Sequence, residues 1–354
     1  MGRASGSSSI EVFTSRLDEV KREEWNAFVS KTGEGTFFHG YEWLKLNEVG
    51  LRAPLFTIQA KRGGRLIGGF PYCLHKPRDF PASCIDSLPM GFGGPILGGR
   101  MDRRRTLDLL FEELETLAST RGVYLTRIRT TGNGHLPYSC YFDSRGFFPV
   151  VRNCSFRIDL QRPMDAVLAD FTPPSRRNLR KAERSGLSVR NCTLSATHID
   201  EFYTLYRKTM RRRGGAVHHK RLFEGIPEYL GEKVLLISAL HPELQAPIAM
   251  MVHLVCANSK TIYYYWGGSD PKYQSSRPNE LLHAWTIRWG MDRNFNTYDL
   301  GGTNADFELG LYRFKRNLGG IPYPNILWVR SRSPWAWRLH QWGRQLYRMV
   351  RSPR

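Results

Sequence analysis

The chain has 354 residues, of which 41% are hydrophobic and 12% aromatic. This composition excludes an intrinsically disordered protein, and the length favours two globular domains. The formal net charge of +20 favours an anionic partner such as nucleic acid, a phosphorylated substrate or an anionic membrane surface.

The six cysteines form no C-x-x-C pair and no Cys/His cluster, so we expect reduced thiols and no metal site. The Gly/Ser-rich segment 1–9 lacks the apolar stretch of a signal peptide, and no apolar run approaches the roughly 18–20 residues of a membrane span. We therefore expect a cytoplasmic protein, either free or peripheral on the inner face of the membrane.

In the first half, apolar residues recur at helical spacing over 16–32 and 36–50. Residues 53–76 predict a hairpin, because two strand-like runs flank an Arg-Gly-Gly turn. An amphipathic helix follows over 100–122, and a strand over 123–130.

The second half repeats this order of elements. We expect helices over 165–186 and 198–215, a run of strands over 233–268, a helix over 279–294 and a strand over 296–302. The shared order predicts an α+β fold made of two copies of one unit.

Several segments, taken together and in this order, resemble one known family. They are TFFHGYEWLKL (36–46), SLPMGFGGPILGG (87–99), SRRNLRKAERSGLSV (175–189), FYTLYRKTMRRRGG (202–215), YYYWGGSDPKYQSSRPNELLHAWTIRWG (263–290) and YDLGGTN…GLYRFKRNLGG (298–320). With them the chain resembles the FemABX family of peptidyl aminoacyltransferases and its FemAB-like, or BioF2-like, relatives.

The resemblance implies an α+β protein of two tandem Gcn5-related N-acyltransferase (GNAT)-like domains, with mixed sheets flanked by helices. After a flexible tail (1–9), we expect a first domain at 10–153, a second at 154–318, and a return segment at 319–333 that completes the first. A C-terminal basic amphipathic helix would occupy 334–354.

The resemblance also implies an enzyme that moves an aminoacyl or acyl group onto an amine of a cell-envelope precursor. The acceptor would be a peptidoglycan peptide or a polysaccharide-linked substrate that carries phosphate or pyrophosphate. The donor would be aminoacyl-tRNA or acyl-CoA, with no bound cofactor. The oligomeric state is left open.

Lys315 is the first catalytic candidate, because acyl transfer needs a cation or hydrogen-bond donor at the developing oxyanion. We expect it on a strand edge before Gly319 and Gly320, facing a cleft. The resemblance matches it to the lysine of the family's Phe-Lys segment, which faces donor and substrate, and places Phe314 beside the substrate. The alternative is a solvated turn lysine.

Asp299 ends a predicted strand, where it could orient the amine or act as a base. Its alternative role is to cap the following turn through its side chain. In the tyrosine run 263–265, Tyr264 should face opposite its two neighbours. Tyr265 is a candidate for lining the substrate cleft, with core packing as the alternative.

Arg212 and Arg213 end a basic stretch in which three consecutive arginines cannot share one helix face. One of them is expected to bind a phosphate, and the resemblance implies the phosphates of the precursor for it and for Lys45. The alternatives are interaction with the helix dipole for the arginines, and an exposed helix lysine for Lys45.

One predicted helix carries a basic stripe at i, i+3, i+4 and i+7. This spacing suits the phosphates of tRNA or of lipid headgroups, with a solvated face as the alternative. The stripe consists of Arg177, Arg180, Lys181 and Arg184.

Two segments bear on an acyl-CoA donor. RTTGNG at 129–134 matches the Arg-x-x-Gly-x-Gly pattern that holds the pyrophosphate in single-domain relatives, but it follows a strand and precedes no helix. KYQSSRPN at 272–279 precedes the corresponding helix and contains no glycine, which disfavours acyl-CoA in the usual binding mode.

The C-terminal segment predicts an interfacial helix that contacts the inner membrane through residues 334–351. Its alternative is a helix docked on its own domain. The expected apolar face contains Trp335, Leu339, Trp342, Leu346 and Met349, with Arg344, Arg348 and Arg351 on the other face.

Two further functions stay open from the sequence. The first is an acyl-CoA-dependent N-acyltransferase that acts on a lipid or sugar amine. The second is a non-enzymatic RNA- or membrane-surface-binding protein, for which Lys315 would be dispensable.

Overall fold

The structure is a computed structural model, and it describes residues 9–76, 82–99, 102–131, 136–244 and 246–333, together with 335, 337, 338, 342 and 343. The chain divides into two compact units. Unit 1 comprises Met1–Val150 and Ile326–Ser352, and unit 2 is formed by Val151–Asn325. The chain passes from one unit to the other within β7 (Phe148–Asp159) and β13 (Ile321–Ser331).

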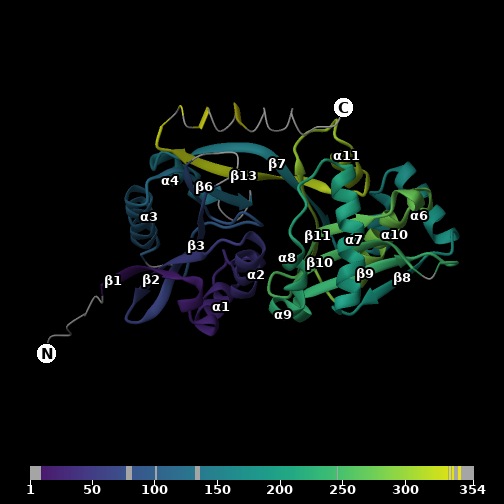
Figure 1. Cartoon of the computed structure of the whole chain (residues 1–354), viewed down its shortest axis with the longest axis horizontal. Helices are drawn as coiled ribbons and strands as arrows, with labels where there is room; N and C mark the ends of the chain where they lie inside the picture. Colours follow the sequence, from purple (N-terminus) through teal and green to yellow (C-terminus); the bar gives the residue numbers. More distant parts are fainter. Residues whose placement is uncertain are drawn as a thin grey trace. The chain divides into compact units, whose positions relative to one another are not determined.

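Unit 1 contains a mixed sheet with helices on both faces (Figure 1). Its strands follow the order β1-β2-β3-β4-β6, then the second part of β13, with β5 paired to β3. The β4–β6 pair is parallel and the pairs β1–β2, β2–β3 and β3–β4 are antiparallel. The elements are β1 (Ile10–Arg16), α1 (Arg22–Lys31), α2 (Tyr41–Leu51), β2 (Leu55–Arg62), β3 (Arg65–His75), β4 (Ser83–Asp86), β5 (Ile96–Leu97), α3 (Arg103–Thr120), β6 (Val123–Thr131) and α4 (Ser139–Ser144), with short 3-10 turns at 17–19, 37–39 and 136–138.

The two glycines of β3 explain how α1 and α3 approach opposite faces of the sheet. A Cβ atom on Gly68 would lie 2.7 Å from Thr106 of α3, and one on Gly69 would lie 2.8 Å from Trp25 of α1. Successive residues of a strand face opposite sides, so the Gly-Gly pair gives both helices room to pack closely.

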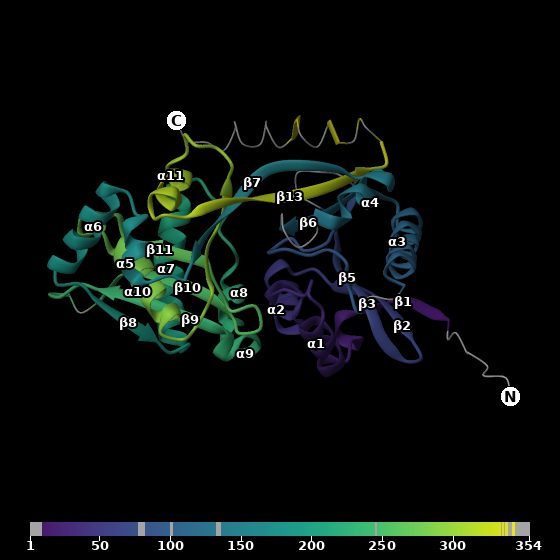
Figure 2. The same ribbon diagram turned by 180° about the vertical axis from the view of Figure 1, so that it is seen from behind.

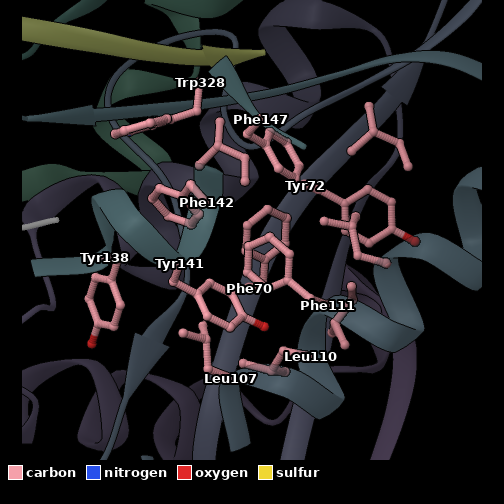
Figure 3. Close-up of a cluster of buried hydrophobic side chains, with 14 of the residues drawn as sticks. Phe70, Tyr72, Leu107, Leu110, Phe111, Tyr138, Tyr141, Phe142, Phe147 and Trp328 are labelled. Carbon is pink, nitrogen blue, oxygen red and sulfur yellow. The ribbon is translucent and has the colours of Figure 1, made fainter. Parts of the chain in front are cut away.

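The core of unit 1 is built around the apolar face of α3. Leu107, Leu110, Phe111 and Leu114 follow helical spacing and pack with aromatic side chains of the sheet, α4 and β13 (Figure 3). Trp328 of β13 lies 5.0 Å from Phe142, ring centre to ring centre. The late segment of the chain therefore contributes a core side chain to the unit formed by the early one.

Unit 2 has a second mixed sheet, in the order β7-β12-β11-β10-β9-β8. The β11–β12 pair is parallel, and the other pairs in this order are antiparallel. The elements after β7 are α5 (Met164–Ala169), α6 (Pro173–Arg184), β8 (Ser188–Cys192), α7 (Ala196–Arg212), α8 (Lys220–Glu224), α9 (Ile226–Tyr229), β9 (Val234–Leu240), β10 (Pro247–Cys256), β11 (Thr261–Ser269), α10 (Pro278–Met291), β12 (Thr297–Asn304) and α11 (Gly310–Asn317), with short 3-10 turns at 231–233 and 271–276.

Helices cover both faces of this sheet as well. α7 packs on β10 and β11 on one face, and α10 packs on β9 and β10 on the other, with α6 against α10 (Figures 1 and 2). Leu282 of α10 is fully buried among side chains of β9 and β10.

A bulge in β11 interrupts the simple alternation of side chains. Val252 pairs with Trp266, whereas His253 pairs with Tyr264, so Tyr265 is an extra residue in the strand. Tyr264 consequently packs with His253 and with His283 of α10, while Trp266 packs with Phe223 of α8.

The predicted hairpin, the long helices and the run of strands are confirmed. The single helix expected over 165–186 was wrong: it is two helices, because Pro173 and Pro174 have no N–H group to continue α5 and instead begin α6. None of the helices in the described ranges combines the length and the apolar character that a membrane span requires.

Candidate functional site

The candidate site lies at a second bulge, which is in β12 of unit 2. Asp299 pairs with Arg157 and Gly302 with Ser155, so two residues of β12 stand opposite one of β7. Gly301 lies in this bulge with φ +77°, and a Cβ atom there would be 2.6 Å from the carbonyl oxygen of Tyr264. The position therefore requires glycine.

Lys315 points at this bulge. Its Nζ donates to the carbonyl oxygens of Gly301 and Gly302, at 2.8 and 2.9 Å, and the side chain is 4% exposed. An ammonium group has three N–H donors, so among the residues that the structure describes these two acceptors leave one N–H for a ligand. The solvated-lysine alternative does not hold, because the side chain is buried.

The expected conformation of this segment was wrong. Lys315 lies in the helix α11 and not on a strand edge. The helix ends at the glycine pair, where the N–H groups of Gly319 and Gly320 donate to the carbonyls of Arg316 and Lys315. These bonds turn the chain from α11 into β13.

Burial lowers the pKa of Lys315 to about 8. The negative charge of Asp299 acts in the opposite direction, and the cation of Arg213 adds to the lowering. At neutral pH the ammonium form still predominates, so the site presents a desolvated cation.

Asp299 is 2% exposed, and hydrogen-bond donors approach both of its carboxylate oxygens. Oδ1 accepts from the N–H of Gly301 at 2.8 Å, and Oδ2 lies 3.4 Å from Nε of Arg157. Burial raises the pKa of Asp299, and Arg157, the Gly301 N–H and Lys315 oppose that shift. Asp299 thus caps the turn that follows it, which was the alternative role considered from the sequence.

Arg157 was not predicted as a site residue. It lies in β7 directly opposite Asp299, and its guanidinium stacks 4.7 Å from the ring centre of Tyr323. The only signal in the sequence is a charge between Phe156 and Ile158 of an apolar strand. Its partners depend on strand register, which the sequence does not reveal.

A buried polar network lies behind Lys315, and the sequence analysis also missed it. The hydroxyl of Tyr298 is 2.7 Å from Nδ1 of His283 and 3.1 Å from Nε2 of His253. Burial lowers the pKa of His253 to about 3 and that of His283 well below its ordinary value, so both imidazoles are neutral. The network thus adds no second cation beside Lys315.

Phe314 is partly buried and packs against the core of unit 2, with its ring 5.7 Å from that of His283. Tyr265 is half-buried, with its ring 4.5 Å from that of Trp266. The substrate contacts expected of these two aromatic residues stay predictions.

The two candidate arginines differ in their surroundings. Arg212 is the last residue of α7, and its guanidinium faces Gln274, which accepts two hydrogen bonds of 2.6 and 2.8 Å when the amide oxygen is turned toward it. Arg213 follows the helix, is exposed, and its charge influences Lys315 and Tyr264. Of the two arginines, Arg213 is therefore the one whose charge acts on Lys315.

The remaining basic candidates lie elsewhere. Lys45 belongs to α2 of unit 1, where its Nζ pairs with Glu48 at 2.9 Å. The four residues of the basic stripe are all exposed on α6, opposite the buried Leu179 and Ala182. They are Arg177, Arg180, Lys181 and Arg184.

Two expectations fall largely outside the described residues. Segment 129–134 matches the pyrophosphate pattern but is expected to be a loop; only 129–131 are described, and they form the end of β6. The basic amphipathic helix over 334–354 is represented by five single residues, of which Trp337 packs on Phe148 at 5.5 Å. Within the described ranges, no group of His, Cys, Asp or Glu side chains is placed to hold a metal ion.

Comparison with known proteins agrees with this fold. The family described as acetyltransferase (GNAT) domain matches residues 175–316, which begin within α6 and end within α11. Aminoacyltransferase FemB of Staphylococcus epidermidis is 25% identical, over 45% of this chain and 53% of FemB. The chain thus spans about half the length of the curated relatives it matches.

Two solved structures share the fold over nearly the whole chain. FemX has a TM-score of 0.68 at 16% identity, covering 97% of this chain and 100% of FemX. A tandem GNAT protein from the clavulanic acid biosynthesis pathway has a TM-score of 0.55 at 13% identity, covering 92% and 99%. These matches confirm the predicted resemblance to the FemABX family and the predicted tandem GNAT fold.

Proposed function

We propose that the protein is an acyltransferase that moves an aminoacyl group from aminoacyl-tRNA to an amine of a cell-envelope precursor. The observation that carries the proposal is Lys315, a buried cation held by two backbone carbonyls with one N–H left over. The GNAT-domain match and the likeness to aminoacyltransferase FemB support the reaction class.

In the reaction, the amine nitrogen of the acceptor attacks the carbonyl carbon of the ester. A C–N bond forms, the C–O bond to the tRNA 3′-oxygen breaks, the amine loses a proton and the leaving oxygen gains one. The third N–H of Lys315 would donate to the oxyanion of the tetrahedral intermediate. A fixed cation stabilises such a charge more strongly in a desolvated site than in water.

Asp299 and Arg157 would position this donor. Donors already approach both oxygens of Asp299, which favours a positioning role over direct proton abstraction. Its negative charge keeps the buried lysine protonated, and its bond to Gly301 holds the bulge in shape.

The exposed cations would bind the anionic parts of the two substrates. We assign Arg213, with Arg212 beside it, to the phosphates of the precursor, and the stripe on α6 to the tRNA backbone. Lys45 of unit 1 is proposed to bind a phosphate as well. These assignments suit a chain with a net charge of +20.

The segment before α10 favours tRNA over acyl-CoA as donor. Residues 272–278 contain no glycine, and α10 begins at Pro278, which has no N–H for a phosphate. Acyl-CoA would thus lack the usual backbone contacts at this helix N-terminus.

The test is transfer by the purified full chain from radiolabelled aminoacyl-tRNA, and separately from acyl-CoA, to a nucleotide-linked muropeptide. Lys315→Ala should lower the single-turnover rate about 10²–10³-fold, whereas Arg316→Ala, at an exposed neighbour on α11, should keep it. Equal rates for the two variants would contradict the proposal. Turnover with acyl-CoA alone would select the second donor, and RNA binding without any transfer would favour a binding protein.

A further inference from the structure

A recess of about 250 Å³ opens on unit 2 beside the candidate site. Side chains of β7, the segment after β12, α11 and β13 line it. On its rim, Phe307 is 72% exposed and Ala305 is also exposed, and Cys154 is buried in its wall.

The walls select for an apolar ligand. Phe307, Tyr312 and Tyr323 supply aromatic surface, two prolines add to it, and none of the described lining residues is charged. The one side-chain amide is that of Asn153. A phosphate or carboxylate would lose its hydration here without an ionic partner, whereas an alkyl or aryl group would gain by leaving water.

The recess and the Lys315 site share a wall. The carbonyl of Gly302 accepts from Lys315, and a Cβ atom on Gly302 would lie 3.8 Å from the backbone oxygen of Cys154. Cys154 also lines the recess, and Tyr312 lies three residues before Lys315 on α11. The recess would therefore lie next to any group that is bound at Lys315.

Arg157 provides a second connection. Its guanidinium stacks on Tyr323, which lines the recess, and its Nε lies 3.4 Å from Oδ2 of Asp299 in the candidate site. The same side chain thus fixes a wall of the recess and the carboxylate near Lys315.

We propose that this recess receives the apolar side chain, or acyl chain, of the group being transferred, while its carbonyl lies at Lys315. The inference rests on the proposed acyltransferase function and adds its substrate class. It assigns to the enzyme a branched or aromatic aminoacyl group, in preference to glycyl or alanyl.

The first test measures selectivity with one tRNA charged with glycine, alanine, leucine or phenylalanine. The wild-type full chain should show kcat/KM at least about tenfold higher for the leucyl or phenylalanyl donor than for the glycyl donor. Ala305→Trp, at an exposed position of the rim, should abolish this preference by lowering the leucyl and phenylalanyl values toward the glycyl value. Leu309→Ala, an exposed apolar residue outside the lining, should leave the preference intact.

The second test does not depend on turnover. Binding of N-acetyl-4-fluorophenylalaninamide to the full chain is followed by fluorine NMR line width, with wild-type, Ala305→Trp and Leu309→Ala proteins. If wild-type and Leu309→Ala proteins broaden the probe signal and Ala305→Trp does not, the recess is supported. If no donor is turned over in the same preparation, the proposed function fails while the recess stands. Transfer without size preference, together with no probe broadening, would overturn the recess and leave the proposed function standing.

Discussion

The buried charged side chains of the two units differ in how their surroundings shift their pKa values. In unit 1, Asp86 accepts from Arg127 at 2.5 and 2.7 Å and lies 2.6 Å from His75, and these partners hold the pKa of its carboxyl well below its usual range. In unit 2, burial shifts the pKa values of Asp299 and Lys315 toward their neutral forms. Such shifts oppose folding and are frequent at functional sites, so the contrast separates a stabilising ion pair from a candidate active site.

Replacing Lys315 by Met should give the largest change in the rate of transfer. It should not cause the loss of stability that follows when a structural ion pair is broken. Transfer should fall about 10²–10³-fold, while the free energy of unfolding should change little, because removal of a buried charge offsets the loss of its two hydrogen bonds to the carbonyls of Gly301 and Gly302. The folded pKa near 8 lies below the unfolded value of 10.5, so the penalty for burying the cation is complete below pH 8 and fades as the pH rises toward 10.5. Urea unfolding at pH 7 and pH 10 checks this, and a marked loss of stability would identify Lys315 as a structural residue.

Asp86→Asn in unit 1 should do the opposite. It leaves Arg127 buried beside a neutral group, so the free energy of unfolding should fall by about 3–5 kcal/mol, with transfer per folded molecule preserved. Asp18→Asn, which removes the exposed partner of Arg16, is the control and should cost less than about 1 kcal/mol. If folded Asp86→Asn protein had a lower specific rate of transfer, Asp86 would not be a purely structural residue, and the proposed contrast between the two units would be wrong.

Gly301→Ala tests the bulge that holds Lys315. The new methyl group would meet the carbonyl of Tyr264 at 2.6 Å in a positive-φ backbone, so we expect a loss of about 1–3 kcal/mol and a slower reaction. Gly310→Ala is the matched control, because an added Cβ atom there meets nothing within 4 Å. If Gly301→Ala were as active as Gly310→Ala, the geometry of the bulge would not matter for catalysis.

The stripe on α6 should give the smallest effect. Arg180→Ala should weaken tRNA binding a few-fold and lower the slope of log affinity against log salt by about 1. Arg104→Ala, an exposed cation of unit 1, is the control. Filter binding across a salt series measures the affinity and the slope for each protein. If wild type and Arg180→Ala had identical slopes, the stripe would be a solvated helix face and not a tRNA-binding surface.

The sequence predicts well those parts of the fold that local patterns determine. The 18-residue α3 and the β2–β3 hairpin follow from helical spacing and an Arg-Gly-Gly turn. α11 was mistaken for a strand edge because it has only eight residues, and so short a helix depends on tertiary packing for its stability. The break at Pro173 could have been read from the Pro-Pro pair.

The candidate site was only partly predictable for a related reason. Lys315 and Asp299 stood out as charges beside glycines, and the family resemblance singled out the lysine. Arg157, His253 and His283 lie in otherwise apolar segments, and their roles depend on strand register and on the bulges of β11 and β12. Long-range pairing of this kind leaves no signature in a single sequence.

The most direct test of the account is the pH dependence of single-turnover transfer, expressed as the ratio of the wild-type rate to the Lys315→Met rate. The ratio removes the common effect of pH on the acceptor amine. If protonated Lys315 stabilises the oxyanion, the ratio should be constant below about pH 7 and fall with an apparent pKa near 8. A ratio that stays flat or rises through pH 8–9 would contradict the claim that the buried ammonium group drives the reaction.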